Sequence, residues 1–228
     1  MVVNNAFLVM SRAPRPGLTK TRLMPGLSPE EACRVHAFIL NRVAGIVNTL
    51  PGKCCLFYIG GSPADFQGLV PDRFEFQLQQ GSDLGERMAN AFSLVFQAGA
   101  GKAIMVGSDI PLLGAGHFQE TLVRLERADL VLGPNFDGGY YLIAMKENWP
   151  QLFQGQEWGT GSVLTRTMAR ASKLGLKTEL LAPEIDIDRV EDIRELCAFL
   201  AGGELKDEQW WEIYEFFISY LKTEEEKS

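Results

Sequence analysis

The sequence predicts an α/β protein in which helices cover both faces of a mostly parallel sheet. Short apolar runs of strand length alternate along the chain with longer segments of helical periodicity. Strand–helix–strand units close as right-handed crossovers, which place the second strand parallel to the first. In such sheets ligands collect at the carboxyl ends of the strands, so the loops that follow the strands are the candidates for function.

Six runs have the length of strands and are rich in β-branched or aromatic residues. They cover residues 6–10, 54–59, 74–78, 103–106, 130–132 and 140–144. Five helices are expected at about 29–50, 83–98, 116–127, 160–174 and 190–200. Ser28, Pro29, Glu30 and Glu31 form a typical helix start, because they supply a cap, a first-turn proline and first-turn acids. Asp83 is expected to cap the second helix.

A further amphipathic helix is predicted near the end of the chain. Its apolar residues recur at helical spacing, namely Trp210, Ile213, Tyr214, Phe217, Ile218 and Leu221. We therefore expect one domain over residues 1–203, followed by a helix and a charged tail over residues 204–228. The helix either packs back on its own domain or forms a homodimer contact.

Composition excludes several classes of protein. With 228 residues, 46% of them hydrophobic, the chain can bury the core of one enzyme-sized domain. A net charge of −7 argues against an extended nucleic-acid surface. The four cysteines form no C-x-x-C pair and the two histidines are far apart, so neither a zinc site nor a disulfide framework is expected. Without a bilayer-length apolar run or a signal peptide, we expect a cytoplasmic protein that binds no membrane.

The loop after the first strand is unusually basic. Between Ser11 and Leu23 it carries Arg12, Arg15, Lys20 and Arg22 without one acidic residue. Such cations offer charge-assisted hydrogen bonds to phosphate oxygens. The loop therefore predicts a phosphate-binding site, with a merely solvated basic loop as the alternative.

Two other loops place aspartates where strands end. Asp109 lies in the loop 107–111, which directly follows the run 103–106, and a hard divalent cation could bridge it there to a diphosphate; alternatively, Asp109 is a turn residue. Asp186 and Asp188 alternate with isoleucines and so share one face just before a helix. One of them is either a second metal ligand or a helix cap.

A fourth loop, residues 132–141, combines paired glycines with Asp137. The glycines allow close approach of the backbone to a ligand, and Asp137 could accept hydrogen bonds from substrate hydroxyls. Asp137 and Gly138 are also typical of a tight turn between two antiparallel strands. Both interpretations can hold together.

Six blocks in this order resemble the nucleotide-diphospho-sugar transferase (GT-A) superfamily. They are KTRL (20–23), QGSDLGERM (80–88), GSDIPLL (107–113), LGPNFDGGYYLI (132–143), WGTGSVL (158–164) and DIDRVEDI (186–193). The chain is most similar to a bacterial family of glycosyltransferase-like proteins, some of them linked to arsenosugar biosynthesis. The resemblance implies a three-layer α/β/α GT-A fold, which is Rossmann-like and has a mostly parallel mixed sheet.

The resemblance also implies roles for individual residues. Asp109 and Asp188 match the positions that hold Mg²⁺ or Mn²⁺ against a nucleotide diphosphate, with Lys20, Asp109 and Asp137 as catalytic candidates. The nucleotide-binding positions are Arg12, Lys20, Arg22, Gln80, Gly81, Asp83 and Leu84. The acceptor side comprises Asp137, Gly138, Gly139, Tyr140, Tyr141, Trp158, Gly159, Thr160 and Gly161.

Two positions depart from the superfamily pattern. The glycine-rich first loop of sugar nucleotidyltransferases is replaced here by Arg-Ala-Pro-Arg-Pro-Gly, residues 12–17. Arg189 stands where a threonine is expected before the acidic pair. The first departure weakens the case for synthesis of nucleotide sugars.

Three functions remain open at this point. The first is glycosyl transfer from a nucleotide sugar to a small acceptor, in which the metal and Lys20 or Arg22 stabilise the leaving diphosphate and Asp137 acts as base. The second is nucleotidyl transfer to a phosphorylated metabolite, because KTRL also resembles the first loop of guanylyltransferases acting on phospholactate-like acids. The third is a non-catalytic nucleotide-binding protein.

Overall fold

A mixed seven-stranded sheet forms the centre of the computed structural model, which describes residues 4–202 and 208–225. The strands are β1 (Asn5–Arg12), β2 (Lys53–Ile59), β3 (Glu75–Leu78), β4 (Lys102–Gly107), β5 (Leu130–Pro134), β6 (Tyr140–Met145) and β7 (Thr178–Leu180). Their order in the sheet is β3-β2-β1-β4-β6-β5-β7. Only β6 runs antiparallel to its neighbours β4 and β5, so the predicted mostly parallel α/β sheet is confirmed.

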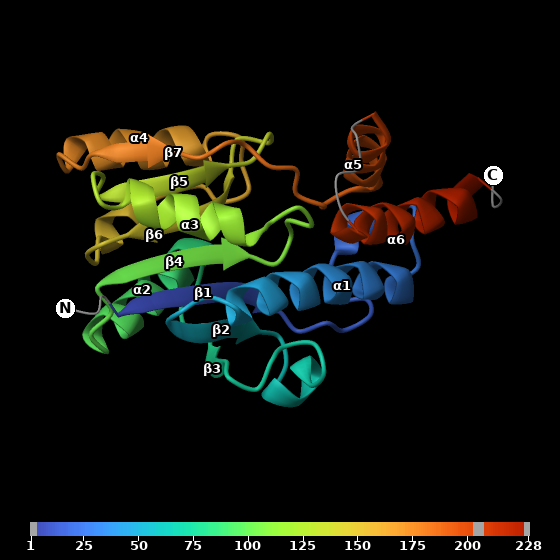
Figure 1. Ribbon diagram of the computed structural model, residues 1–228, viewed down its shortest axis with the longest axis horizontal. Coiled ribbons are helices and arrows are strands. Elements are labelled where there is room, and N and C mark those ends of the chain that lie inside the picture. Colours follow the sequence, from blue (N-terminus) through green and yellow to red (C-terminus); the bar gives the residue numbers. More distant parts are fainter. Residues whose placement is uncertain (1–3, 203–207, 226–228) are drawn as a thin grey trace.

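Helices cover the sheet on both faces (Figure 1). They are α1 (Pro29–Asn48), α2 (Leu84–Gln97), α3 (Ala115–Arg124), α4 (Val163–Lys173), α5 (Val190–Gly202) and α6 (Glu208–Glu225), with short 3₁₀ turns at Thr21–Leu23, Pro63–Phe66 and Pro150–Phe153. Alternate residues of β1 serve the two faces, as expected of a strand. Phe7 and Val9 belong to the core beneath α1 and α3, whereas Ala6 and Leu8 belong to the core beneath α2 and α4.

The predicted helix caps at Ser28 and Asp83 are confirmed. Ser28 Oγ accepts a hydrogen bond from the Glu31 amide at 3.2 Å, and the Glu31 carboxylate accepts one from the Ser28 amide at 2.7 Å. This reciprocal pair is a capping box, which satisfies two donors at the helix end. Asp83 caps α2 by accepting from the Glu86 amide at 2.9 Å.

The structure differs from the prediction in three places. Strand β7 was not expected, because its three residues at the sheet edge carry too little apolar pattern to be recognised. Helix α4 begins at Val163 instead of Thr160, because Thr160 belongs to a turn before the helix. In this turn the Val163 amide donates a hydrogen bond to the Thr160 carbonyl oxygen. Helix α3 ends at Arg124, and the predicted last residues through Arg127 form a turn.

Helix α6 packs against α1 and α5 (Figure 1). The ring of Phe216 stacks on that of Phe38 in α1 at 3.7 Å, and Ile213, Phe217 and Tyr220 are buried. The apolar face of this helix is thus covered by its own domain. The predicted boundary at residue 203 stays a prediction, since residues 203–207 lie outside the described part.

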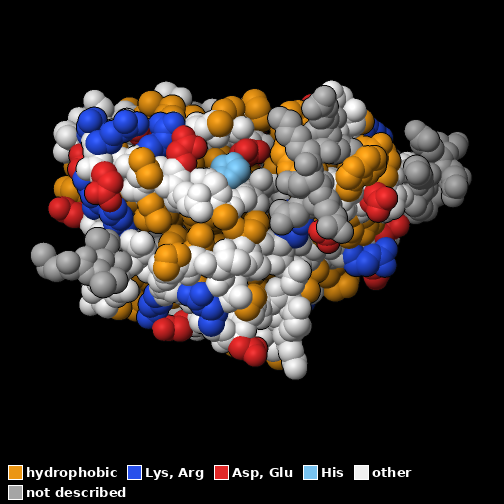
Figure 2. Space-filling model, viewed as in Figure 1, with side chains coloured by type: hydrophobic (Ala, Val, Ile, Leu, Met, Phe, Trp, Pro, Cys, Tyr) orange, Lys and Arg blue, Asp and Glu red, His pale blue; other side chains and the backbone are white. Residues whose placement is uncertain are grey.

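Two arginines near the sheet edge, Arg124 and Arg127, pair with Glu179, and the described helices include none that is both long and apolar enough to cross a membrane. Figure 2 shows Lys and Arg side chains gathered where β7 and α4 lie, with acidic side chains beside them. Hydrophobic side chains are also visible on this face where α5 and α6 lie. Three of the four cysteines are buried, and all four are free, as the sequence predicts.

Candidate active site

A cleft of about 690 Å³ opens at the carboxyl ends of the central strands. Two features of the topology bring its walls together. The parallel strands β1 and β4 end at the same sheet edge, so the loops that follow them meet there. Strand β6 is antiparallel and begins at this edge, which carries the β5–β6 turn to the same place. The cleft therefore lies where the fold class predicts a ligand.

Lys20 lies at the centre of the charged half of the cleft. Its ammonium lies 2.5 Å from Asp109 Oδ1 and 3.7 Å from Asp188 Oδ1, and it donates a hydrogen bond to the carbonyl oxygen of Ile187. Only 5% of the lysine side chain is exposed, against 44% and 41% of the two aspartates. The lysine is thus enclosed, and the carboxylates present their remaining surface to the cleft.

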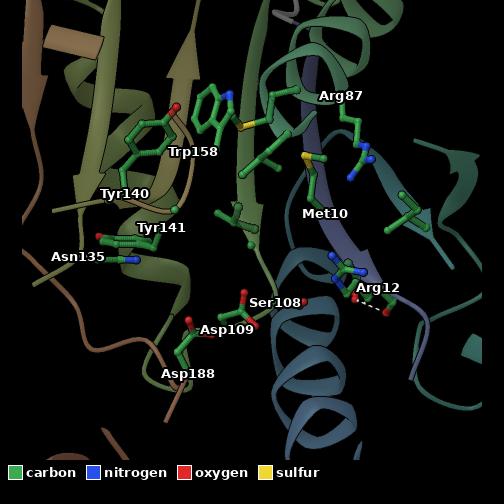
Figure 3. A pocket seen from close by; sticks show the side chains of 18 of the residues that line it. Met10, Arg12, Arg87, Ser108, Asp109, Asn135, Tyr140, Tyr141, Trp158 and Asp188 are labelled. Atoms are coloured by element: carbon green, nitrogen blue, oxygen red, sulfur yellow. Dashed lines mark hydrogen bonds between the residues drawn. The ribbon is translucent and has the colours of Figure 1, made fainter. Parts of the chain in front are cut away.

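The carboxyl groups of Asp109 and Asp188 lie next to one another on the cleft floor (Figure 3). Burial raises the pKa of Asp109, but the positive charges of Lys20 and Arg12 outweigh it, so its net pKa is below the ordinary value. The carboxylate therefore stays ionised across the physiological pH range. Asp188 also accepts a hydrogen bond from Arg22 Nη1 at 2.7 Å through its other oxygen.

A third carboxyl group near these two, that of Asp186, has a raised pKa instead of a lowered one. Burial raises the pKa of Asp186 to about 7, and the nearby carboxylates of Asp137, Asp188 and Asp109 act in the same direction. Asp186 is not among the residues that line the cleft. The crowding of acidic groups makes this region favourable for a cation.

The donor set fits a Mg²⁺ or Mn²⁺ ion that completes its coordination with ligand oxygens. Asp109 and Asp188 converge on one point, where the ammonium of Lys20 now lies. Within the described residues, no group of three or more His, Cys, Asp or Glu side chains could hold a metal by itself. Mg²⁺ is commonly bound by one or two carboxylates plus substrate phosphates, which matches this pair.

Helix capping was the alternative role for Asp188, but the carboxylate that caps the backbone here is that of Asp192. The amides of Asp188 and Arg189 donate to the carboxylate of Asp192, at 2.8 and 2.5 Å. Asp192 thus satisfies the backbone before α5. This leaves the side chain of Asp188 available to Lys20 and Arg22.

The four cations of the opening loop have different partners. Arg15 binds Asp65 through two hydrogen bonds of 2.9 Å, away from the cleft, while Lys20 and Arg22 bind the aspartates described above. Arg12 lines the cleft, is exposed, and forms no ion pair with a carboxylate of the described residues. Arg12 is therefore the cation of this loop that is available to an anionic ligand.

Arg87, in the first turns of α2, is a second cation that is available to an anionic ligand. Its guanidinium donates to the carbonyl oxygens of Gly81 and Ser82 at 3.1 and 3.4 Å. The neighbouring Glu86 carboxylate is engaged by the amide and hydroxyl of Ser82, both at 2.8 Å. In the described chain Arg87 has no acidic partner, and Figure 3 shows it on the same side of the cleft as Arg12.

His36 fixes the backbone from which Arg12 projects. Its Nε2 lies 3.0 Å from the Arg12 carbonyl oxygen and 3.2 Å from Ser11 Oγ. Burial lowers the pKa of His36, and although Asp109 opposes this, the net shift is downward. A neutral imidazole with its proton on Nε2 can donate to the Arg12 carbonyl, so His36 holds the loop without adding charge.

The other half of the cleft is largely apolar. Met10, Met88, Met105, Ile143 and Trp158 line it. Figure 3 shows Asn135, Tyr140, Tyr141 and Trp158 on the side opposite Arg12 and Arg87. The cleft thus joins a charged floor to a wall suited to an apolar or aromatic part of a ligand.

The loop carrying Asp137 is a tight turn and also borders the cleft. The amide of Gly138 donates to the Asn135 carbonyl and that of Asn135 to the Gly139 carbonyl, which closes the turn between β5 and β6. Asp137 Oδ1 accepts from the Gly139 amide at 2.8 Å, and the residue lines the cleft. The interpretation as a turn is therefore confirmed, and the substrate-binding role of Asp137 stays a prediction.

The cleft contains most, but not all, of the residues expected in the site. Those that line it are Arg12, Lys20, Arg22, Leu84, Asp109, Asp137, Gly139, Tyr140, Tyr141, Trp158, Gly159, Thr160 and Asp188. Gly138 underlies its rim, where a side chain would collide with the backbone of Gly161. Gln80 instead lines a separate hollow with Leu78 and Leu94, and Asp83 acts as a helix cap. Neither Gly81 nor Gly161 reaches the cleft.

Sequence reasoning missed Ser11, His36 and Arg87. His36 is an ionisable residue on the apolar stripe of a predicted helix, and that signal could have identified it. Arg87 lies inside a block already recognised as distinctive. Arg87 is informative because it has no acidic partner in the described chain, and no local sequence pattern reveals this.

Comparisons with known proteins identify relatives of this chain. The sequence pattern of a family described as "Uncharacterized protein conserved in bacteria (DUF2064)" matches residues 43–160. A crystal structure from Desulfovibrio desulfuricans G20, provisionally identified as a nucleotide-diphospho-sugar transferase, is 28% identical with a TM-score of 0.85. The match covers 95% of this chain and 97% of that one. The predicted resemblance to this class of protein is confirmed.

Two further relatives are transferases of nucleotides by name. Phosphoenolpyruvate guanylyltransferase of Chloroflexus aggregans (strain MD-66 / DSM 9485) is 31% identical over 133 residues, which are 57% of this chain and 60% of that protein. The match thus spans less than two thirds of that relative. A cytidylyltransferase from Leptospira borgpetersenii serovar Hardjo-bovis (strain JB197) has a TM-score of 0.57 and 11% identity, and covers 96% of both chains. This second likeness concerns the fold alone.

Proposed function

This chain belongs to the bacterial DUF2064 family, and we propose that it is a metal-dependent transferase acting on a nucleotide diphosphate substrate. The observation that carries the proposal is the ion cluster of Lys20, Asp109 and Asp188 at the carboxyl ends of the strands. Two ionised carboxylates beside cations without acidic partners suit a phosphorylated ligand and a divalent ion together.

The preferred reaction is glycosyl transfer from a nucleotide sugar to a small acceptor, consistent with the relative from Desulfovibrio desulfuricans. The acceptor hydroxyl oxygen attacks the anomeric carbon, the bond to the diphosphate breaks, and the nucleoside diphosphate leaves. Asp137 is the candidate base for the hydroxyl proton, since its Oδ1 is oriented by the Gly139 amide at the cleft rim.

Stabilisation of the leaving diphosphate is assigned to the charged floor. Arg12, Lys20 and Arg87 supply donors to phosphate oxygens, and hydrogen bonds between ionised partners are roughly twice as strong as neutral ones. Asp109 and Asp188 would hold the divalent cation, which supplies Lewis-acid neutralisation of the diphosphate when bound. The apolar wall with Trp158 then receives the rest of the donor or acceptor.

The relative from Chloroflexus aggregans favours a second candidate, guanylyl transfer to a phosphorylated acid. In that reaction a phosphate oxygen of the acceptor attacks the α-phosphorus of GTP, and pyrophosphate leaves. The same cations would stabilise the pyrophosphate. Asp137 would then have no proton to remove from an ionised phosphate.

The two reactions are separated by their products. The protein would be incubated with Mn²⁺ and either GTP plus phosphoenolpyruvate or a panel of nucleotide sugars, and released pyrophosphate and nucleoside diphosphate would be measured. Release of the nucleoside diphosphate alone supports glycosyl transfer, whereas pyrophosphate from GTP supports the second candidate. If neither product forms yet nucleotides bind, the chain is a non-catalytic nucleotide-binding protein.

Asp109→Asn provides the residue-level test. The amide keeps the shape but removes a charge, so metal-dependent nucleotide binding should be lost and turnover should fall about 10²-fold or more. Asp72→Asn, at an exposed position away from the cleft, is the matched control and should change neither. Unaltered Mn²⁺-dependent binding by the Asp109 variant would contradict the proposal.

A further inference from the structure

The two carboxylates assigned to a divalent cation already have a cation between them. The Lys20 ammonium contacts Oδ1 of Asp109 and lies within ion-pair distance of Oδ1 of Asp188. Lys20 also has a left-handed backbone with φ of 50°, unlike any other non-glycine residue of the described chain. Such a conformation costs free energy and persists where surrounding contacts fix it.

A divalent ion and this ammonium compete for the same carboxylate oxygens. Mg²⁺ binds carboxylate oxygens at about 2.1 Å, and two cations that close repel one another strongly in a partly buried site. We infer that Lys20 is a built-in counter-ion that a divalent cation must displace in order to occupy the site. This inference rests on the proposed function and adds to it a competition between two cations.

The displaced ammonium has a destination on the ligand. Lysine carries its charge on a flexible four-carbon stem, and Lys20 lies on the same loop as Arg12, which faces the cleft without an acidic partner. A nucleotide phosphate would give the ammonium a new partner in place of the two aspartates. Metal ion and nucleotide therefore favour each other's binding, and metal alone binds weakly.

Arg22 provides a matched comparison. It also carries one positive charge and binds Asp188, but through the other oxygen, Oδ2, and 57% of its side chain is exposed. Removing Arg22 deletes a charge without vacating the point on which both aspartates converge. Any effect specific to Lys20 must then come from the position of its ammonium.

The test measures Mn²⁺ affinity, by paramagnetic resonance of free Mn²⁺, without nucleotide and with GDP or UDP. Lys20→Met should bind Mn²⁺ alone about tenfold more tightly than the native chain, because the two carboxylates are then free. Arg22→Met should stay within about threefold, and Asp109→Asn should lose the site. Lys20→Gln repeats the test if the methionine variant unfolds.

The native chain gives a check that needs no variant. A nucleoside diphosphate should raise its Mn²⁺ affinity about tenfold or more, and this coupling should shrink in Lys20→Met. Unchanged or weaker Mn²⁺ binding by both Lys20 variants would overturn the inference, as would equal Mn²⁺ affinity of the native chain with and without nucleotide. Failure of the proposed function itself would be seen separately, as absence of product and of nucleotide binding in the native chain.

Discussion

At the scale of single residues, pairing decides which cations of the opening loop are available to a ligand. The acid-free stretch of sequence suggests four equivalent charges, but three of them bind carboxylates from distant parts of the chain. Arg12 differs because it faces the cleft without such a partner. In a chain with 29 acidic and 22 basic residues, an arginine in a cleft without an acidic partner is informative.

This difference between Arg12 and the other cations of the loop makes a prediction, for which Arg15, three residues away, provides the control. Arg12→Gln should weaken binding of a nucleoside diphosphate about tenfold, because a charge-assisted hydrogen bond is lost, and should leave the affinity for the free nucleoside unchanged. Arg15→Gln removes the same charge outside the cleft and should not alter either affinity. Isothermal titration measures both; equal losses in the two variants would show that Arg12 touches no phosphate.

At the scale of elements, the segment before α5 carries Asp188, and its contacts with other elements include the following three. The Ile187 amide donates to the Asp109 carbonyl at 2.9 Å, and the Glu184 amide donates to the Pro134 carbonyl at 3.1 Å. His117 of α3 lies 2.9 Å from the Glu184 carboxylate through Nε2. These contacts fix the distance between the metal-binding candidates, which follow the central strand β4 and the edge strand β7.

The His117 contact makes the stability of this segment dependent on pH. The hydrogen bond and charge of Glu184 raise the pKa of His117 above 6.5, although burial opposes them. A group whose pKa is higher in the folded than in the unfolded state contributes stability. This contribution is complete below the unfolded-state pKa and is lost as the pH rises through the folded-state pKa.

We therefore expect His117→Gln to lose more stability at about pH 5.5 than at about pH 8.5, measured by urea unfolding. Glu184→Gln should show the same dependence, because it removes the partner that raises the pKa. A loss of equal size at both pH values would mean that the pair contributes only a neutral hydrogen bond.

The β5–β6 turn makes a second prediction about an element. Gly138 has φ of 87°, and a Cβ there would lie 2.2 Å from the carbonyl oxygen of Gly161. Gly138→Ala should cost more than about 2 kcal/mol of unfolding free energy, because strain and a backbone collision add. Gly175→Ala has a similar φ of 72° but open space, so it should cost only about 1 kcal/mol. Equal costs would show that the turn shifts freely.

The elements were predictable from sequence to different degrees, for physical reasons. Helices with caps, such as α1 with Ser28, and strands with continuous apolar runs follow from local chemistry. The three-residue β7 does not follow from local chemistry, because its sequence has too little apolar pattern and its pairing with β5 stabilises it. The partners of Lys20 lie 89 and 168 residues further along the chain, so no spacing rule could join them.

At the scale of the whole molecule, α6 completes the core without contributing to the cleft. It buries Ile213 and Phe217 against α1 and α5, and none of its side chains that the structure describes lines the cleft. A homodimer contact was the alternative for this apolar face. The packing within one chain leaves Trp211 and Phe199 as the large exposed apolar side chains of this region, at 50% and 52%.

Two substitutions in α6 separate packing on the parent domain from packing on a second copy. Phe217→Ala removes a fully buried ring and should cost about 3–5 kcal/mol, whereas Trp211→Ala at an exposed position should cost less than about 1 kcal/mol. Unfolding midpoints of both variants and of the native chain should not depend on protein concentration, since mass action stabilises only associating chains. The folded fraction of each variant should bind nucleotide with native affinity. A midpoint that rises with concentration and is lowered by Trp211→Ala would instead assign the exposed side of α6 to a dimer, and loss of nucleotide binding in folded Phe217→Ala would connect the helix to the site.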